Sequence, residues 1–311
     1  MKPVLFVTNH VAPNRVGAFD ALAQRLPLEV VTFGGKAHHG GGSVPYGRPV
    51  DEGDVREIAA GDWRAVICGI SGRRALAGAF TGARDKPFVL WTSLWAHPRS
   101  AAQIAGYPLT RAIYRRAHAV VTYGEHVSAY VRAKGATNVH VAPQSVDNAF
   151  WSAPAGEKAP AFEVLFVGRD DPAKGLHVLK EAWPEATVVT GGASPEELRN
   201  FYARAHVLVV PSLRTRTFRE PWGLVVNEAM NQRTAIIASD EVGAAAGGLV
   251  RHERNGLVVA AGDTGALRTA IARLRDDPAT TARMGDQGHA DVQSYTHDAW
   301  AAGFEAALRD C

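Results

Sequence analysis

Short apolar runs alternate with helical segments along the whole chain, and the alternation starts afresh after residue 161. The runs are rich in β-branched residues and are too short for helices, which is typical of buried parallel strands. The expected strands of the first half are 4–8, 29–33, 65–68, 88–91, 119–122 and 139–142. Those of the second half are 163–168, 187–190, 206–211, 234–238 and 257–259. Repeated βα units predict a doubly wound α/β sheet in each half.

A segment without periodicity separates the halves. Residues 152–161 include two prolines and indicate a linker. We therefore expect one Rossmann-like domain over 1–152 and a second over 162–295, with a closing helix at about 296–311 that returns to the first. Two such domains are expected to face a central cleft, which is a natural ligand site. Residues 34–62 fit no element, and we interpret them as a long loop, either a mobile loop at the cleft or a disordered excursion. We expect His38 and His39 to be solvated rather than metal-bound.

The composition is that of a globular protein in a reducing compartment. With 46% hydrophobic residues the chain has enough apolar surface for a full core. No apolar run approaches the roughly 18 residues of a membrane span. The apolar run at the start of the sequence is too short for a signal peptide, because polar residues follow it early. Two cysteines, Cys68 and Cys311, form no disulfide framework, so a cytoplasmic location is expected.

Charge is distributed unevenly between the halves. Residues 1–155 hold 17 Lys/Arg and 10 Asp/Glu, a balance of +7, whereas 156–311 hold 17 and 21, a balance of −4. A basic half suggests an anionic partner, and Arg111, Arg115 and Arg116 form a basic helical face suited to peripheral contact with an anionic membrane. Solvated faces are the alternative for these arginines. The chain has no recognisable nucleic-acid motif, so we expect no nucleic-acid partner.

Two glutamates frame a strand-to-helix junction. Glu220 follows the expected strand 206–211, and Glu228 lies eight positions further, on the helix expected from Gly223. Glu220 should therefore lie at the carboxyl end of a parallel strand, where open α/β sheets bind ligands. Backbone N–H groups of Trp222, Gly223 and Leu224 could receive an anion between them. Two acids beside an anion site suit a phosphorylated sugar.

The string at 220–230 (EPWGLVVNEAM) resembles the Glu-x7-Glu signature of retaining glycosyltransferases of the two-Rossmann (GT-B) architecture, in particular family 4. Residues 166–176 (FVGRDDPAKGL) are similar to another segment of that family. So are residues 141–147 (VAPQSVD), 238–240 (ASD), 242–243 (VG) and 255–258 (NGLV). These motifs occur in the family's order over about 119–259, and that order makes the resemblance specific.

The resemblance implies a role for each matching residue. Arg169 and Lys174 would neutralise a diphosphate leaving group, Glu228 would bind ribose hydroxyls and Glu220 would contact the transferred sugar. In the first domain, His97 would lie near the donor sugar and flanking tryptophans could stack on a sugar, although core packing is the commoner use of Trp. The expected donor-binding set is Gly17, Arg169, Lys174, Trp222, Gly223, Leu224, Val225 and Glu228.

Several other classes are disfavoured by missing motifs. The chain has no Asp-x-Asp metal motif, no Gly-x-Gly-x-x-Gly dinucleotide fingerprint and no Walker A sequence. We therefore expect a metal-independent, retaining enzyme without a cofactor, which moves a hexose from a nucleotide diphosphate sugar to an acceptor hydroxyl. The alternatives are an epimerase or inverting transferase of the same fold, or a non-catalytic nucleotide-sugar binder. The sugar, base and acceptor are left open.

Overall fold

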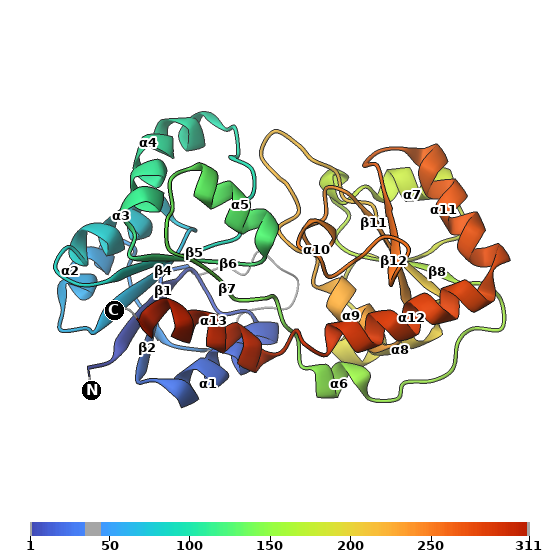
Figure 1. The fold of residues 1–311 in the computed structure, drawn as a ribbon, viewed down its shortest axis with the longest axis horizontal. Helices are drawn as coiled ribbons and strands as arrows, with labels where there is room; N and C mark the ends of the chain where they lie inside the picture. The colour runs from blue at the N-terminus through green and yellow to red at the C-terminus, as the bar shows by residue number, and fades with distance from the viewer. Residues whose placement is uncertain (1, 35–44, 310–311) are drawn as a thin grey trace. The chain divides into compact units, whose positions relative to one another are not determined.

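The computed structural model describes residues 2–34 and 45–309 (Figure 1). The chain divides into two compact units: unit 1 combines residues 1–144 with 296–311, and unit 2 comprises 145–295. The division at Gln144 comes before the expected linker. Residues beyond it already belong to unit 2, because helix α6 (Asn148–Ser152) packs on helix α9 (Val225–Asn231).

Unit 1 is built on a parallel sheet whose described strands follow the order β3-β2-β1-β4-β5-β6-β7. The strands are β1 (Val4–Thr8), β2 (Leu28–Thr32), β3 (Arg48–Pro49), β4 (Ala65–Gly69), β5 (Phe88–Thr92), β6 (Ala119–Thr122) and β7 (Val139–Val141). β1, β4 and β5 are buried along their whole length, which explains their continuous apolar sequences. Strand order reverses between β1 and β4, so their carboxyl ends form a topological switch point.

Helices cover both faces of this sheet. One face packs against α1 (Val16–Arg25) and α13 (His297–Arg309), which lie side by side in Figure 1. Against the other face pack α2 (Val55–Ala60), α3 (Arg73–Gly82), the end of α4 (Ala101–Arg116) and α5 (Glu125–Ala133). Trp300 of α13 is 0% exposed, and its ring lies 5.4 Å from Phe19, 5.8 Å from Trp91 and 4.4 Å from Phe304. The chain segment that follows unit 2 therefore completes the core of unit 1.

The interpretation of residues 34–62 as one long loop is wrong for its described part. Strand β3 pairs in parallel with β2, and α2 packs on α3. β3 has two exposed residues, and α2 buries only Val55 and Ala59, so neither element produces a strong periodic signal. His38 and His39 lie outside the described residues.

Unit 2 is a smaller parallel sheet whose described strands follow the order β12-β11-β10-β8-β9. The strands are β8 (Val164–Val167), β9 (Thr187–Val189), β10 (Val207–Val210), β11 (Ala235–Ser239) and β12 (Gly256–Val259). The remaining helices are α7 (Leu176–Ala182), α8 (Pro195–Arg204), α10 (Gly243–Ala246), α11 (Thr264–Asp276) and α12 (Pro278–Val292). The chain passes from β8 to β9 on one side and then to β10 on the other. A second switch point therefore lies between β8 and β10.

Local signals place several helix starts where the sequence predicts them. Ser194 and Glu197 form the expected capping box at α8, and Asp263 accepts a hydrogen bond from the Ala266 N–H at the start of α11. The linker is tied to unit 2, because Lys158 Nζ donates to the Ala205 carbonyl at 2.6 Å. The prediction of two parallel α/β units is confirmed by the two sheets.

Candidate functional site

The turn between β8 and α7 is shaped by one glycine. Gly175 has φ of 70°, and a Cβ at this position would lie 2.0 Å from the carbonyl oxygen of Pro211 at the end of β10. Only a glycine lets these two backbone segments approach so closely. Asp171 stabilises the same turn by accepting a hydrogen bond of 2.9 Å from the Ala173 N–H. The turn therefore presents Lys174 beside the neighbouring strand of the sheet.

Lys174 and Glu220 meet at the switch point of unit 2. They are 46 residues apart in sequence, but β8 and β10 are adjacent and parallel, so the loops that follow them lie at the same edge. Lys174 Nζ pairs with Glu220 Oε2, and Ser212 Oγ donates to the same carboxylate oxygen at 3.2 Å. The side chains are 20% and 8% exposed respectively. Because the pair is largely shielded from water, removal of either partner would leave a poorly solvated charge.

The segment from Glu220 to Leu224 is held in place by α10. The Gly243 N–H donates to the Glu220 carbonyl at 3.1 Å, and the Ala244 N–H donates to the Trp222 carbonyl at 2.8 Å. Trp222 is buried, and its Nε1 donates to Asn227 Oδ1 at 2.8 Å. The expected helix start at Gly223 is wrong by two residues, because this glycine has φ of 90° and α9 begins at Val225.

Glu228 lies on α9 in a partly buried environment. The hydroxyl of Tyr202 on α8 donates to Glu228 Oε2 at 2.7 Å. Burial raises the pKa of Glu228 to about 7, although the hydrogen bond from Tyr202 acts in the opposite direction. The carboxyl group is therefore close to a change of protonation state at neutral pH. Tyr202 is not among the site residues predicted from the sequence.

Arg169 does not join the Lys174–Glu220 pair in this structure. Its side chain is 49% exposed, and its ion-pair partner is Asp171, with Nη2 3.9 Å from Oδ2. Such a long, solvated contact holds the guanidinium weakly. Arg169 thus lies on the β8–α7 turn, as expected, but extends into solvent.

In unit 1, the predicted residues make contacts that are structural. A Cβ on Gly17 would lie 2.6 Å from the His297 ring, so the glycine allows α13 to pack against α1. His97 Nε2 lies 3.0 Å from the Gln103 carbonyl oxygen, and its ring lies 4.5 Å from that of Tyr107. These contacts account for both residues within unit 1, and the donor-binding role of each stays a prediction.

The tryptophans near His97 are core residues. Trp91 is 7% exposed and Trp95 is 9% exposed. The guanidinium of Arg15 lies 5.0 Å from the ring centre of Trp91 and also bonds with Gln144. The alternative that these tryptophans pack in the core therefore describes the structure better than sugar stacking.

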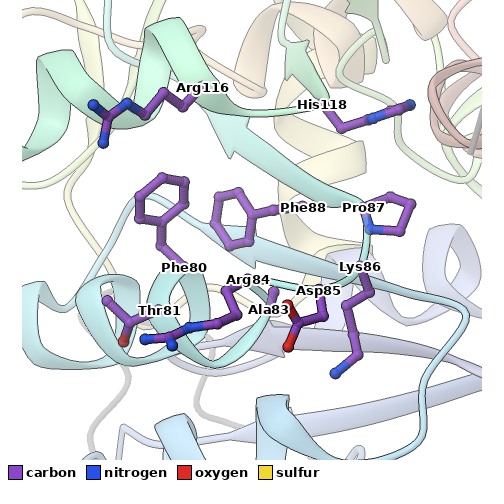
Figure 2. A pocket seen from close by; sticks show the side chains of 10 residues that line it. All are labelled: Phe80, Thr81, Ala83, Arg84, Asp85, Lys86, Pro87, Phe88, Arg116 and His118. Carbon is purple, nitrogen blue, oxygen red and sulfur yellow. The ribbon is translucent and has the colours of Figure 1, made fainter.

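Unit 1 has a pocket of about 650 Å³ that the sequence did not predict (Figure 2). It lies at the amino ends of β5 and β6, the edge opposite to the switch-point edge of that sheet. Phe80 and Phe88 lie between Arg116 and Arg84 in this view. Lys86, which also lines it, donates to the carbonyls of Ala59 and Ala60 at the end of α2. These bases lie at helix carboxyl ends, where the macrodipole favours a cation.

The described residues show neither a cluster of metal ligands nor a helix that could span a membrane. Within 2–34 and 45–309, no three or more His, Cys, Asp or Glu side chains gather as a metal site would require. In the same ranges, every helix is too short or too polar to cross a bilayer.

The sequence of unit 2 matches a known family. Residues 152–277 match the family described as glycosyl transferases group 1. Over 122 residues the chain is 34% identical to a D-inositol 3-phosphate glycosyltransferase of Streptomyces scabiei. That match covers 37% of this chain and 25% of the relative, so it spans about a quarter of the curated protein.

Solved structures resemble the chain over its whole length. Sucrose-phosphate synthase from Thermosynechococcus elongatus has a TM-score of 0.74 at 19% identity, with 100% of this chain and 99% of that chain covered. Anabaena Alr3699/HepE, solved in complex with UDP and glucose, has a TM-score of 0.75 at 15% identity, with both chains fully covered. At these identities the likeness concerns the fold, and it confirms the predicted GT-B architecture.

Proposed function

We propose that this chain, whose residues 152–277 match the glycosyl transferases group 1 family, transfers a hexose from a nucleotide diphosphate sugar to an acceptor hydroxyl with retention of configuration. One observation carries the proposal. Lys174, Glu220 and Glu228 lie on the two loop–helix segments that follow adjacent parallel strands, at the switch point where α/β sheets bind ligands. A cation there suits the charge of a diphosphate, and two carboxylates can accept hydrogen bonds from the hydroxyls of a sugar and a ribose.

The proposed mechanism relies on positioning and on charge stabilisation. Lys174 and Arg169 would stabilise the diphosphate as the bond from the sugar C1 to its oxygen breaks. The acceptor oxygen would bond to C1 from the same face, and its proton would pass to the departing phosphate oxygen. Glu220 would accept hydrogen bonds from sugar hydroxyls, and Glu228 would accept them from the ribose diol. In unit 1, His97 and Gly17 would approach the donor, as the family resemblance implies.

The Lys174–Glu220 pair has a consequence for this mechanism. In this structure Lys174 is paired with Glu220. A diphosphate must compete with this carboxylate for Lys174, and its binding releases Glu220 to accept hydrogen bonds from the sugar. Diphosphate binding and sugar binding would then be coupled through one side chain.

The donor can be tested by thermal unfolding. UDP, GDP and dTDP are compared, and we expect one of them to stabilise the protein by about 2.7 kcal/mol when present at about 100 times its Kd. UDP is the first choice because structural relatives were solved with it. Glu228→Gln should weaken binding of the bare nucleotide, whereas Glu220→Gln should retain it and lose transfer. Equal losses of nucleotide affinity in both variants would contradict the assigned roles.

The competing enzyme classes predict other products. An inverting transferase would give the opposite anomer, which NMR of the product distinguishes. An epimerase would change the donor sugar without an acceptor. A non-catalytic binder would bind the nucleotide sugar, but would neither hydrolyse nor transfer it. Retained anomeric configuration in a transferred hexose is the outcome that supports the proposal.

The outer face of α4 supports a further part of the proposal, reversible docking on an anionic membrane. The helix contains no acidic residue, and Arg111, Arg115 and Arg116 are exposed. Among the described residues, large exposed hydrophobic side chains include Ile104 at 56% and Leu109 at 36%, both on this helix. Arg111 follows Ile104 by seven residues, so the two share a face. Exposed apolar and basic side chains together are typical of helices that lie in a membrane interface.

Vesicle co-sedimentation tests this docking. We expect binding to vesicles with anionic lipid at low salt, weaker binding at high salt, and loss of binding in the triple Arg111→Gln, Arg115→Gln, Arg116→Gln variant. Each base near an anionic surface contributes about 1 kcal/mol. The control is a triple variant with the same charge change on exposed bases of unit 2, Lys180→Gln, Arg204→Gln and Arg283→Gln. Equal loss in both variants would mean that only net charge matters.

A further inference from the structure

Tyr202 holds the carboxylate that is proposed to bind ribose. It is 0% exposed, and its hydroxyl donates to Glu228 Oε2 at 2.7 Å. Among the described residues, no side chain is seen to donate to the other oxygen, Oε1. The contact therefore occupies one oxygen of the carboxylate and leaves the second available for a ligand hydroxyl.

Packing fixes the position of the Tyr202 ring. Its centre lies 5.8 Å from that of Trp151, at an angle of 63°. The Thr234 hydroxyl donates to the Tyr202 carbonyl at 2.7 Å and so ties this turn of α8 to the start of β11. A side chain held in this way loses little further freedom when it orients a neighbour, which is what a preorganised site requires.

Tyr202 keeps its proton at this position and can therefore donate to Glu228. Burial, with the nearby Glu228 carboxylate, raises the pKa of the Tyr202 phenol well above its ordinary value. The phenol therefore keeps its proton throughout the neutral range. Its hydrogen bond stabilises the ionised form of Glu228, whereas burial favours the protonated form.

Charged side chains on the two long helices that pack against α9 have partners other than Glu228. The strands β10 and β11 are apolar at this point, and α6 carries no titratable side chain. On α8 and α12, Arg199 donates to the Phe150 carbonyl, His289 bonds with the Asn231 carbonyl, Asp286 pairs with Arg233, and Asp291 pairs with Arg254. Tyr202 is thus the side chain that tunes Glu228.

We infer that Tyr202 is a positioning residue for nucleotide binding, which orients the Glu228 carboxylate and keeps it ionised so that it accepts hydrogen bonds from the ribose diol. The inference rests on the proposed function, in which Glu228 binds ribose. The inference adds to the site a residue that lies outside the Glu-x7-Glu string at 220–230. It also predicts that the affinity for the donor depends on pH near neutrality. Affinity should fall as the pH decreases through the pKa of Glu228, because a protonated carboxyl offers fewer acceptor sites to the diol.

The test is the pH profile of UDP and GDP affinity in wild type, Tyr202→Phe and Glu228→Gln, measured by calorimetry from pH 6 to 9. Loss of the phenol hydroxyl removes a hydrogen bond to the ionised carboxylate, so the midpoint should rise by about one pH unit. Tyr202→Phe should then bind the nucleotide about fivefold more weakly at pH 7, but nearly as well as wild type at pH 9. Glu228→Gln should bind the nucleotide weakly at every pH, because it has no carboxyl group whose titration could produce the midpoint.

Two outcomes contradict the inference. Equal weakening at all pH values would give Tyr202 a purely structural role, and an unchanged midpoint would remove its effect on Glu228. Carboxyl-carbon NMR of ligand-free protein, assigned with Glu228→Gln, measures the same midpoint independently. If neither nucleotide binds wild type, the proposed function fails. The NMR midpoint still decides whether Tyr202 controls the protonation of the Glu228 carboxyl. If this midpoint is the same in Tyr202→Phe as in wild type, that control is rejected.

Discussion

Replacement of Lys174 by methionine is expected to lower turnover about 10²- to 10³-fold, because removal of one preorganised charge from a reacting centre has effects of this size. The change should also destabilise unit 2. Glu220 is 8% exposed, and it would lose the cation that compensates its charge. The hydrogen bond from Ser212 Oγ would remain, but it carries no compensating charge.

A double variant separates the two effects of this substitution. Lys174→Met combined with Glu220→Gln removes both charges and should recover much of the lost stability, since no unpaired carboxylate remains. Glu220→Gln alone frees Lys174 and should bind UDP at least as tightly as wild type. The double variant should bind UDP weakly. If the double variant bound UDP as tightly as Glu220→Gln does, Lys174 would stabilise the fold but would not bind the diphosphate.

Replacement of Trp300 by alanine is expected to lower the free energy of unfolding by about 3–5 kcal/mol, the cost of a large cavity in a packed core. Its ring is fully buried among aromatic side chains from β1, α1, β5 and α13. Typical domains are stable by only about 5–15 kcal/mol, so unit 1 would lose a large share of its stability. Urea unfolding followed by circular dichroism provides the measurement.

Trp183→Ala provides the matched comparison. This tryptophan lies in unit 2 and is only partly buried, with the Arg275 guanidinium 5.3 Å from its ring centre. The same substitution there should cost much less, because less apolar surface is removed from the core. A loss in Trp300→Ala as small as that expected for Trp183→Ala would show that α13 contributes little to unit 1.

The sequence predicted elements well where one residue pattern decides the structure. Buried parallel strands such as β4 and β5 have continuous apolar sequences, and Ser194 with Glu197 marks a helix start by local chemistry. Strand β3 and helix α2 were missed because their pairing and packing leave little periodicity. The helix start at Gly223 was misplaced because a positive φ cannot be inferred from a glycine alone.

The contacts of the site depended on strand order, which the sequence does not display. Lys174 and Glu220 meet because β8 lies beside β10, a neighbour that follows only after β9 in the chain. Tyr202 belongs to no matched motif, and its effect on Glu228 follows from the packing of α8 on α9. The identities of the acidic and basic residues were therefore predictable, whereas their partners were not.

The return of α13 to unit 1 affects the order in which the two units can fold during synthesis. Residues 145–295 are contiguous, so unit 2 can fold as soon as it leaves the ribosome. Unit 1 emerges first but lacks α13 until residues 296–309 have been added, and meanwhile the part of the aromatic surface around Phe6, Phe19 and Trp91 that α13 covers has no helix over it. The nascent chain thus carries an uncovered apolar patch throughout the translation of unit 2, which makes this interval the one in which chaperone protection matters most.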